Sequence, residues 1–423
     1  MKFSFSVLAA SLLGLTYGFT PINDNVQIGF DVWFQSIQDR CANKNVKFGL
    51  VLDASSISKT AYHDIDVILE SNKIKVVGAI APAKGIRSDI ADGPQVSTGI
   101  YSDAATGVNV TDASGFTNGS DWSKAYASMK ADVIVIDIQD VGSRFYPRIW
   151  SMYDALVGAA LSGKKVIVLD RPNPINGNVV DGEVVSPGFE SQIGKAPISI
   201  RHGMTIGELA TMFNEEFLPK DSQLSESANK KAKLEVIKMK GWTRDMYFDQ
   251  TGLNWFTPVQ TIPVPDTALF YAGSGLFTEI NISNGEGTTV PFEVFGAPYV
   301  ADLGLQSLEQ SANAKNVPGV IFRPMYFAPW AGKLLNVNCA GLQAHVQDRN
   351  TFQPISAAIA SLAAMKDVFP DQYNFVTSVI DKYYGNSNLR TMLESGSSVQ
   401  QIVDSYGPSL ATFKSVRSKY LLY

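Results

Sequence analysis

Four runs of aliphatic and β-branched residues constrain the fold of this chain more than any other feature. They cover residues 46–52, 74–80, 132–138 and 165–169. The runs are nearly continuous and do not alternate with polar residues, which is typical of parallel strands covered on both faces. Segments with helical spacing of apolar residues, such as 151–160, separate them. The pattern predicts an α/β fold with a Rossmann-like, doubly wound, mostly parallel sheet.

The first eighteen residues have the pattern of a secretory signal peptide. Lys2 precedes an apolar run over 3–15, and the small residues Thr16 and Gly18 stand where a signal peptidase cleaves. The run is too short for a stable membrane span. We therefore expect the protein to be secreted to the extracellular space, with no membrane partner.

Extracellular chains often carry glycans and disulfides. Asn109, Asn118 and Asn281 each begin an Asn-x-Ser/Thr triplet, so we expect a glycoprotein if the host glycosylates. After removal of residues 1–18, Cys41 and Cys339 are the remaining cysteines. One disulfide and two buried thiols fit this pair equally well.

Chain length predicts two domains, because about 400 mature residues exceed what one core comfortably holds. The segment 219–233 is polar and charged, and we place the boundary there. The expected arrangement is a Rossmann-like domain over 19–228 and a smaller α+β domain over 229–423, with a cleft between them. The oligomeric state is left open.

Composition and motifs exclude several functional classes. A net charge of −5 argues against nucleic acid as a partner. The chain has no G-x-G-x-x-G, no Walker loop and no nucleophile elbow, and its three histidines are scattered. We therefore expect neither a cofactor nor a metal.

Polar residues gather where two of the predicted strands end. One segment carries Asp137, Asp140, Arg144 and Tyr146, and the next carries Asp170, Arg171 and Asn173. Ligands of open α/β sheets bind at this edge. Asp140 and Asp170 are our candidates for catalytic carboxylates, although an Asp at a strand end often caps a helix instead. Asp137 is expected to be buried and to pair with Arg144 or Arg171.

A third polar segment, 200–205, precedes a predicted helix. Thr205 and Glu208 form a capping-box pattern at its start. His202 fits two interpretations equally, an acid/base group or a residue that holds the turn, and Arg201 is a candidate substrate ligand.

At these segments the chain resembles the secreted exo-β-N-acetylmuramidases of peptidoglycan turnover. The matching stretches span nearly the whole mature chain in order: 137–146, 170–174, 201–209, 241–249, 265–269, 339–348 and 417–423. The resemblance implies a Rossmann-like domain, a smaller C-terminal domain, a cleft between them, and cofactor-free release of terminal N-acetylmuramic acid.

The chain departs from this family in the loops expected to face the cleft. The family's Ser-Pro-Glu-His-Gly, whose Glu is the proposed catalytic carboxylate, is replaced by residues 81–85, with Ala83 at the Glu position and Lys84 at the His position. In the family's Thr-Asn-Leu-Ser-Glu-Gly-Arg-Gly-Thr, a Glu has become Asn284 and an Arg has become Glu286.

These departures leave two functional hypotheses. The first is a glycoside hydrolase with a modified site that acts on terminal amino sugars of peptidoglycan-type glycans. Hydrolysis normally needs two carboxyl groups, for which the sequence offers Asp140, Asp170, Glu279 and Glu286. Residues predicted to contact the carbohydrate are Lys84, Arg144, Tyr146, Arg171, Asn173, Arg201 and Glu286. The second hypothesis is a secreted carbohydrate-binding protein without catalysis.

Overall fold

The computed structural model describes residues 26–39, 45–88, 99–278, 280–375 and 377–423. The predicted signal peptide, Cys41 and Glu279 lie outside the described residues. Cys339 is buried.

A seven-stranded sheet with the order β3-β4-β2-β1-β5-β6-β9 forms the centre of the N-terminal domain. Its middle contains the four predicted strands, β1 (Lys47–Leu52), β2 (Lys75–Ala81), β5 (Val133–Asp137) and β6 (Lys165–Leu169). The edge strands are β3 (Ile100–Ser102) and β9 (Lys233–Ile237), and β4 (Asn109–Asp112) lies between β3 and β2. Neighbouring strands are parallel, except that β3 is antiparallel to β4.

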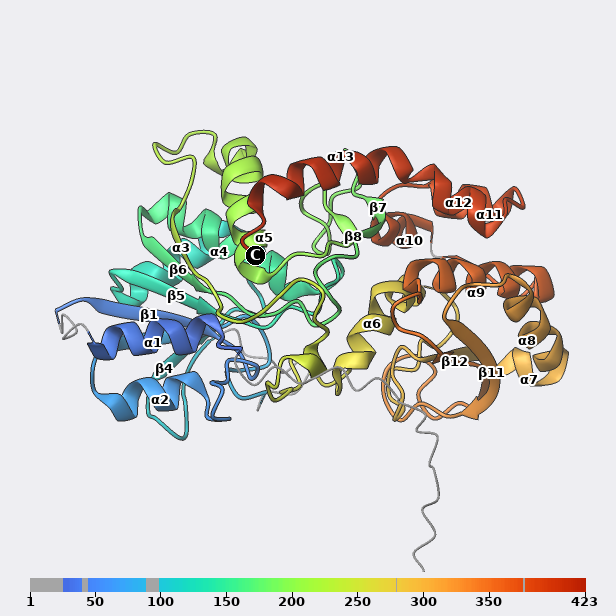
Figure 1. Cartoon of the computed structure of the whole chain (residues 1–423), viewed down its shortest axis with the longest axis horizontal. Coiled ribbons are helices and arrows are strands. Elements are labelled where there is room, and N and C mark those ends of the chain that lie inside the picture. Colours follow the sequence, from blue (N-terminus) through green and yellow to red (C-terminus); the bar gives the residue numbers. More distant parts are fainter. Residues whose placement is uncertain (1–25, 40–44, 89–98, 279, 376) are drawn as a thin grey trace, which may run out of the picture.

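Alternate side chains of the central strands enter two separate hydrophobic cores. Leu50 and Leu52 pack in a core with α1 (Gly29–Asp39) and α2 (Asp64–Ser71). Val51, between them, belongs to the core formed with α3 (Gly119–Met129) and α4 (Pro147–Ser162). Helices therefore cover both faces of the sheet (Figure 1), which confirms the predicted doubly wound fold.

The C-terminal domain is smaller and of α+β type. Its antiparallel sheet has the order β10-β12-β11, formed by β10 (Val294–Ala297), β11 (Val320–Phe327) and β12 (Cys339–Val346). Its packed helices are α6 (Pro265–Ser274), α7 (Pro298–Leu303), α8 (Leu305–Ala314) and α9 (Pro354–Val368). The short helices α10 (Thr377–Tyr384), α11 (Asn388–Glu394) and α12 (Val399–Ser405) follow. The core of this domain is continuous with the α3–α4 core of the first.

The predicted domain boundary at residues 228 and 229 needs correction. β9 pairs in parallel with β6 and completes the N-terminal sheet, so residues 233–237 belong to the first domain. Lys240 also bridges to Gln27, and Tyr247 bridges to Ile175. The polar stretch before β9, residues 219–232, connects α5 to β9 through 3-10 turns, and the smaller domain begins near α6.

The chain returns to the N-terminal domain at its end. α13 (Gly407–Arg417) runs from α12 back across the top of Figure 1 and reaches α5 (Ile206–Met212) and the two-stranded ribbon of β7 (Asp181–Val184) and β8 (Ser199–Arg201). Arg417 donates hydrogen bonds to the carbonyl oxygens of His202 (3.1 Å), Gly203 (2.6 Å) and Gly177 (2.5 Å).

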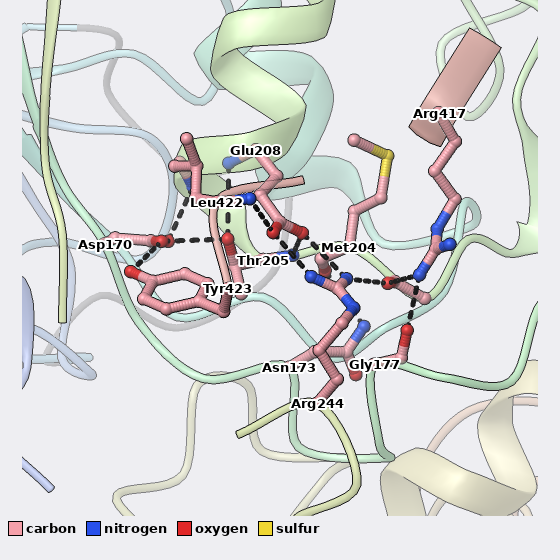
Figure 2. A network of polar contacts seen from close by, with 12 residues as sticks. Asp170, Asn173, Gly177, Met204, Thr205, Glu208, Arg244, Arg417, Leu422 and Tyr423 are labelled. Carbon is pink, nitrogen blue, oxygen red and sulfur yellow. Dashed lines mark hydrogen bonds and ion pairs between the residues drawn. The ribbon is translucent and has the colours of Figure 1, made fainter. Parts of the chain in front are cut away.

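The start of α5 is the anchor for this returning segment (Figure 2). Thr205 and Glu208 form the predicted capping box. Glu208 also pairs with Arg244 at 2.6 Å and accepts from the backbone N–H of Leu422 at 2.7 Å. Since Glu208 is fully buried, these charge-assisted contacts offset the cost of its desolvation.

Asp170 lies in the same network and links β6, α5 and the C-terminal residue. Its carboxylate accepts hydrogen bonds from the Thr205 hydroxyl (2.9 Å) and the Tyr423 hydroxyl (2.7 Å). It also accepts from the backbone N–H groups of Gly207 (2.7 Å) and Arg171 (3.0 Å). Burial nevertheless raises the pKa of Asp170 to about 7, because desolvation outweighs these donors.

A buried ion-pair cluster lies at the carboxyl ends of β5 and β6, beside the start of α2. Arg171 pairs with Asp137, donating from Nη2 to Oδ2 at 2.9 Å, and lies 3.3 Å from Asp64. Both carboxylates are fully buried. Of the two predicted partners for Asp137, the structure selects Arg171.

We expect Arg171→Met to destabilise the protein by about 3–5 kcal/mol, because it would leave Asp137 and Asp64 buried without a cation. Urea denaturation measures the change. Lys231→Met, which removes a pair with Glu215 whose side chains are 45% and 40% exposed, should cost less than about 1 kcal/mol. Equal effects of the two substitutions would contradict the expectation.

The raised pKa of Asp170 predicts a pH-dependent effect of Asp170→Asn. A carboxyl group whose pKa is higher in the folded than in the unfolded state stabilises the fold most at a pH below its pKa in the unfolded state. For Asp170 this stabilisation is lost as the pH rises from about 4 to about 7. The wild type should therefore lose stability relative to Asp170→Asn over this range, with a slope of up to roughly 1.4 kcal/mol per pH unit. Denaturation of both proteins at pH 4, 5.5 and 7 tests this, and a constant difference would refute it.

Candidate active site

A pocket of about 530 Å³ lies between the two domains. Its N-terminal wall comes from the loop after β2, the start of α4 and residues 192–195. Its C-terminal wall comes from α6, the 286–292 loop and the end of α10. The predicted interdomain cleft is therefore present, and its size is typical of a small-molecule site.

The loop that departs from the resembled family lines this pocket. Pro82, Ala83 and Lys84 are all part of the wall. Lys84 has a φ of 57°, in the left-handed region that residues other than glycine seldom adopt, and Gly85 follows at 73°. A glutamate at the position of Ala83, which the resemblance implies for the family, would place its carboxylate in the pocket wall.

Two further predicted ligands, Tyr146 and Glu286, also line the pocket. Tyr146 directly precedes α4, and its hydroxyl is buried with no hydrogen-bond partner among the described residues. Burial raises the pKa of this phenol well above its ordinary value, so it stays protonated. Glu286 accepts a hydrogen bond from the Asn284 amide at 3.3 Å. The three predicted pocket ligands that the structure brings together are Lys84, Tyr146 and Glu286.

Asp140 and His202 form a buried pair beside Tyr146. His202 Nε2 lies 3.2 Å from Asp140 Oδ2, which also accepts from the Gly142 N–H at 2.9 Å. His202 Nδ1 accepts from the Met204 N–H at 3.1 Å, so a neutral ring carries its proton on Nε2. Asp140 Oδ1 is buried and has no partner in the described structure. The pair fixes the loop that carries Tyr146, and neither side chain reaches the pocket wall.

The other predicted site residues are fully engaged inside the fold. Asp170 sits in the network of Figure 2, away from the pocket, with its oxygens bonded to α5 and Tyr423. Asn173 donates to the Met204 carbonyl at 2.9 Å and accepts from the Ile175 N–H at 3.1 Å. These contacts make both residues structural, and they do not support the predicted catalytic and binding functions.

The three predicted arginine ligands are corrected in the same way. Arg171 is held by Asp137, and Arg201 donates to the Ile175 carbonyl. Arg144 donates to the carbonyls of Glu183 (2.7 Å), Ile198 (3.1 Å) and Tyr384 (2.9 Å), and also to that of Tyr383. All three guanidinium groups are buried and none lines the pocket. The sequence indicated the strand ends correctly but could not show that their arginines point into the fold.

Sequence reasoning missed a charged strip of α4 and its partner loop. Arg148, Ser151 and Asp154 line the pocket together with Lys195. Arg148 pairs with Asp53 at 3.1 Å, and Lys195 pairs with Asp154 at 2.5 Å. Positions 148, 151 and 154 are spaced by three residues, which places them on one face of a helix. This polar spacing could have indicated a helix face that lines a site.

Metal-type clusters and membrane-spanning helices are both absent from the described residues. The described part of the chain holds no group of His, Cys, Asp and Glu arranged to bind a metal ion. No helix within the described ranges is long and apolar enough to cross a bilayer.

Comparison with known families matches almost the whole chain. The N-terminal model of the family "Exo-beta-N-acetylmuramidase NamZ" covers residues 48–266, and its C-terminal model covers residues 269–423. The junction of these models agrees with the boundary near α6.

Individual relatives agree with this match. The chain is 35% identical to the peptidoglycan β-N-acetylmuramidase NamZ of Bacillus subtilis (strain 168), over 99% of this chain and 96% of that protein. A DUF1343 family protein of Bacteroides fragilis superposes with a TM-score of 0.82 at 29% identity, over 95% of this chain and 100% of that one. A second protein of that family and organism gives a TM-score of 0.71 at 27% identity, over 94% and 99% of the two chains.

The fold, the interdomain pocket and these matches lead to one assignment. The chain belongs to the exo-β-N-acetylmuramidase NamZ family.

Proposed function

We propose that the protein is a secreted glycoside hydrolase that removes terminal N-acetylmuramic acid from peptidoglycan fragments, using a modified carboxylate set. The full-length match to a peptidoglycan β-N-acetylmuramidase supports the substrate class. The pocket supports the position of the chemistry, because it contains the altered loop at Ala83 and Lys84 together with Glu286.

Glu286 is the best-placed carboxylate for acid/base catalysis in this pocket. The described lining includes two carboxyl groups, those of Asp154 and Glu286. Asp154 is already held by Lys195 at 2.5 Å, whereas Glu286 is bonded to the neutral amide of Asn284. One accessible carboxyl is sufficient where the substrate's own acetamido group assists, an exception to the usual pair of carboxylates.

Lys84 gives the altered loop a different function from that of the family's histidine. An ammonium group in a partly enclosed pocket attracts anions. N-acetylmuramic acid carries a carboxylate on its lactyl group. We therefore assign Lys84 to recognition of this carboxylate, with Tyr146 as a neutral hydrogen-bond donor beside it.

The alternative function is carbohydrate binding without catalysis. It is favoured by Ala83, because a methyl side chain can neither donate nor accept a proton in the pocket where the family has its glutamate. Hydrolysis of a chromogenic β-N-acetylmuramic acid glycoside, with a family member that retains the glutamate as positive control, separates the two functions.

We expect Glu286→Gln to lower kcat/KM on this glycoside by at least about 100-fold, because the amide cannot transfer the proton. Glu226→Gln, at an exposed position remote from the pocket lining, serves as the control and should leave kcat/KM unchanged. Full activity of Glu286→Gln would exclude Glu286 as the acid/base group.

The double substitution Ala83→Glu with Lys84→His should raise the hydrolysis rate by roughly 100-fold or more, since it restores a general acid to the pocket wall. The same assay measures it, with Lys84→His alone as the control. If the wild type is inactive and the double variant active, the binding function applies to the natural protein. If the double variant is no faster than the wild type, the loss of a glutamate at position 83 does not limit the hydrolysis rate of this protein.

A further inference from the structure

The hairpin that joins β11 to β12, at the right of Figure 1, carries a group of exposed apolar side chains. Tyr326 and Trp330 are each 70% exposed, Leu335 is 53% exposed and Val337 is 38% exposed. Single exposed apolar residues are common on protein surfaces, but a group of them in one short segment is typical of a binding surface. The hairpin is therefore a candidate for contact with a ligand.

Trp330 differs from the other five tryptophans of the chain, which are all buried or half-buried. Trp255, which also lies in a loop near a proline, is half-buried and donates its indole N–H to the Ile262 carbonyl at 3.3 Å. The exposure of Trp330 is thus a property of its place in the hairpin.

The tip of the hairpin packs against the loop that carries Glu286. The Trp330 N–H donates to the Gly287 carbonyl at 2.7 Å. A Cβ atom on Gly287 would lie 2.2 Å from the Ala331 carbonyl oxygen, and one on Gly332 would lie 3.4 Å from the Glu286 Cβ. Glu286 lines the interdomain pocket, whereas Trp330 does not. The indole therefore lies outside the pocket, next to its C-terminal wall.

Hydrogen bonds hold the hairpin in one conformation. Lys333 Nζ donates to the carbonyls of Phe277 (2.8 Å) and Ile280 (2.9 Å). The Asn336 N–H donates to the Pro329 carbonyl at 2.7 Å and closes the loop. A ligand that meets a preorganised loop loses less conformational entropy on binding, and an indole has only two side-chain torsions to fix.

The position and chemistry of Trp330 favour a sugar as its ligand. An indole offers a flat apolar face with a negative π surface. The C–H groups on one face of a pyranose ring are apolar and weakly positive, so they complement this surface while the ring hydroxyls stay in water. A glycan bound by its terminal sugar must leave the pocket across a rim, and Trp330 stands beside the C-terminal wall.

We propose that Trp330 is a stacking platform for a sugar of the glycan chain that lies outside the pocket. The platform gives the protein a preference for long peptidoglycan strands over short fragments. This inference rests on the proposed sugar-binding function and adds selection by chain length.

Isothermal titration calorimetry with two peptide-free oligosaccharides tests the platform. The probes are a disaccharide and a tetrasaccharide of alternating N-acetylmuramic acid and N-acetylglucosamine, with sulfur in place of the oxygen of the terminal glycosidic bond to prevent hydrolysis. We expect the wild type to bind the tetrasaccharide at least about fivefold more tightly than the disaccharide. Trp330→Ala should remove most of this preference, and Trp330→Phe should keep most of it because it retains an aromatic face.

Iodide quenching of tryptophan fluorescence locates the contact. Because Trp330 is the strongly exposed tryptophan of the described chain, it should account for most of the quenching by this surface reagent. The tetrasaccharide should protect the wild type from quenching, and the disaccharide should not. Trp330→Phe should show little quenching with or without either probe.

A matched control separates stacking from a general effect of removing a surface aromatic. Tyr62 is 66% exposed, lies between β1 and α2, and does not line the pocket. Tyr62→Ala should keep the preference for the tetrasaccharide. Thermal melting of each variant identifies any loss of folding.

Three outcomes would overturn the platform. If the wild type binds both oligosaccharides equally, or Trp330→Ala weakens both to the same extent, the platform is rejected while the proposed function stands. If a peptide-bearing disaccharide protects Trp330 from iodide and the tetrasaccharide does not, the hairpin binds the peptide and not the glycan. If the wild type binds neither oligosaccharide, the platform and the proposed function fail together.

Discussion

The buried guanidinium group of Arg144 holds the two walls of the pocket together. Arg144 follows β5, and its donors reach the carbonyls of Glu183 and Ile198 on one side and of Tyr383 and Tyr384 on the other. Its own carbonyl accepts from the indole N–H of Trp150 in α4 at 2.8 Å. Because burial lowers the pKa of Arg144 only to about 9, the side chain remains charged at neutral pH. Tyr383 lines the pocket, so the Arg144 side chain ties α10 to the pocket-lining loops of the N-terminal domain.

This constraint explains how the pocket wall can change while the fold persists. The residues that position the wall, including Arg144, Asp140 and His202, lie behind it and are bound by other groups of the protein. The residues that differ from the resembled family, Ala83, Lys84 and Glu286, project from loops into the pocket. Substitution at the surface of a pocket does not disturb the buried network, because few buried contacts depend on those side chains.

Much of the fold could be predicted, because runs of aliphatic and β-branched residues mark the buried strands of the sheet. The four central strands and the capping box at Thr205 follow from local patterns. The predicted boundary assigned β9 to the second domain, whereas it pairs with β6 of the first. The sequence of a strand does not determine which sheet edge it joins. The candidate site was predicted less well. Lys84, Tyr146 and Glu286 lie in the pocket, but Asp170 and Arg201 are held inside by backbone groups that only the tertiary structure brings near them.

The C-terminal return has a consequence for the order in which the protein can fold. Tyr423 binds Asp170 across 253 residues of chain, and Leu422 binds Glu208 across 214. The sheet of the first domain is therefore synthesised long before the groups that satisfy these two buried carboxylates. If the first domain folds during translation, both acids lack these partners until the second domain has been made. We therefore expect the C-terminal residues to couple the stability of the two domains, although each has its own sheet.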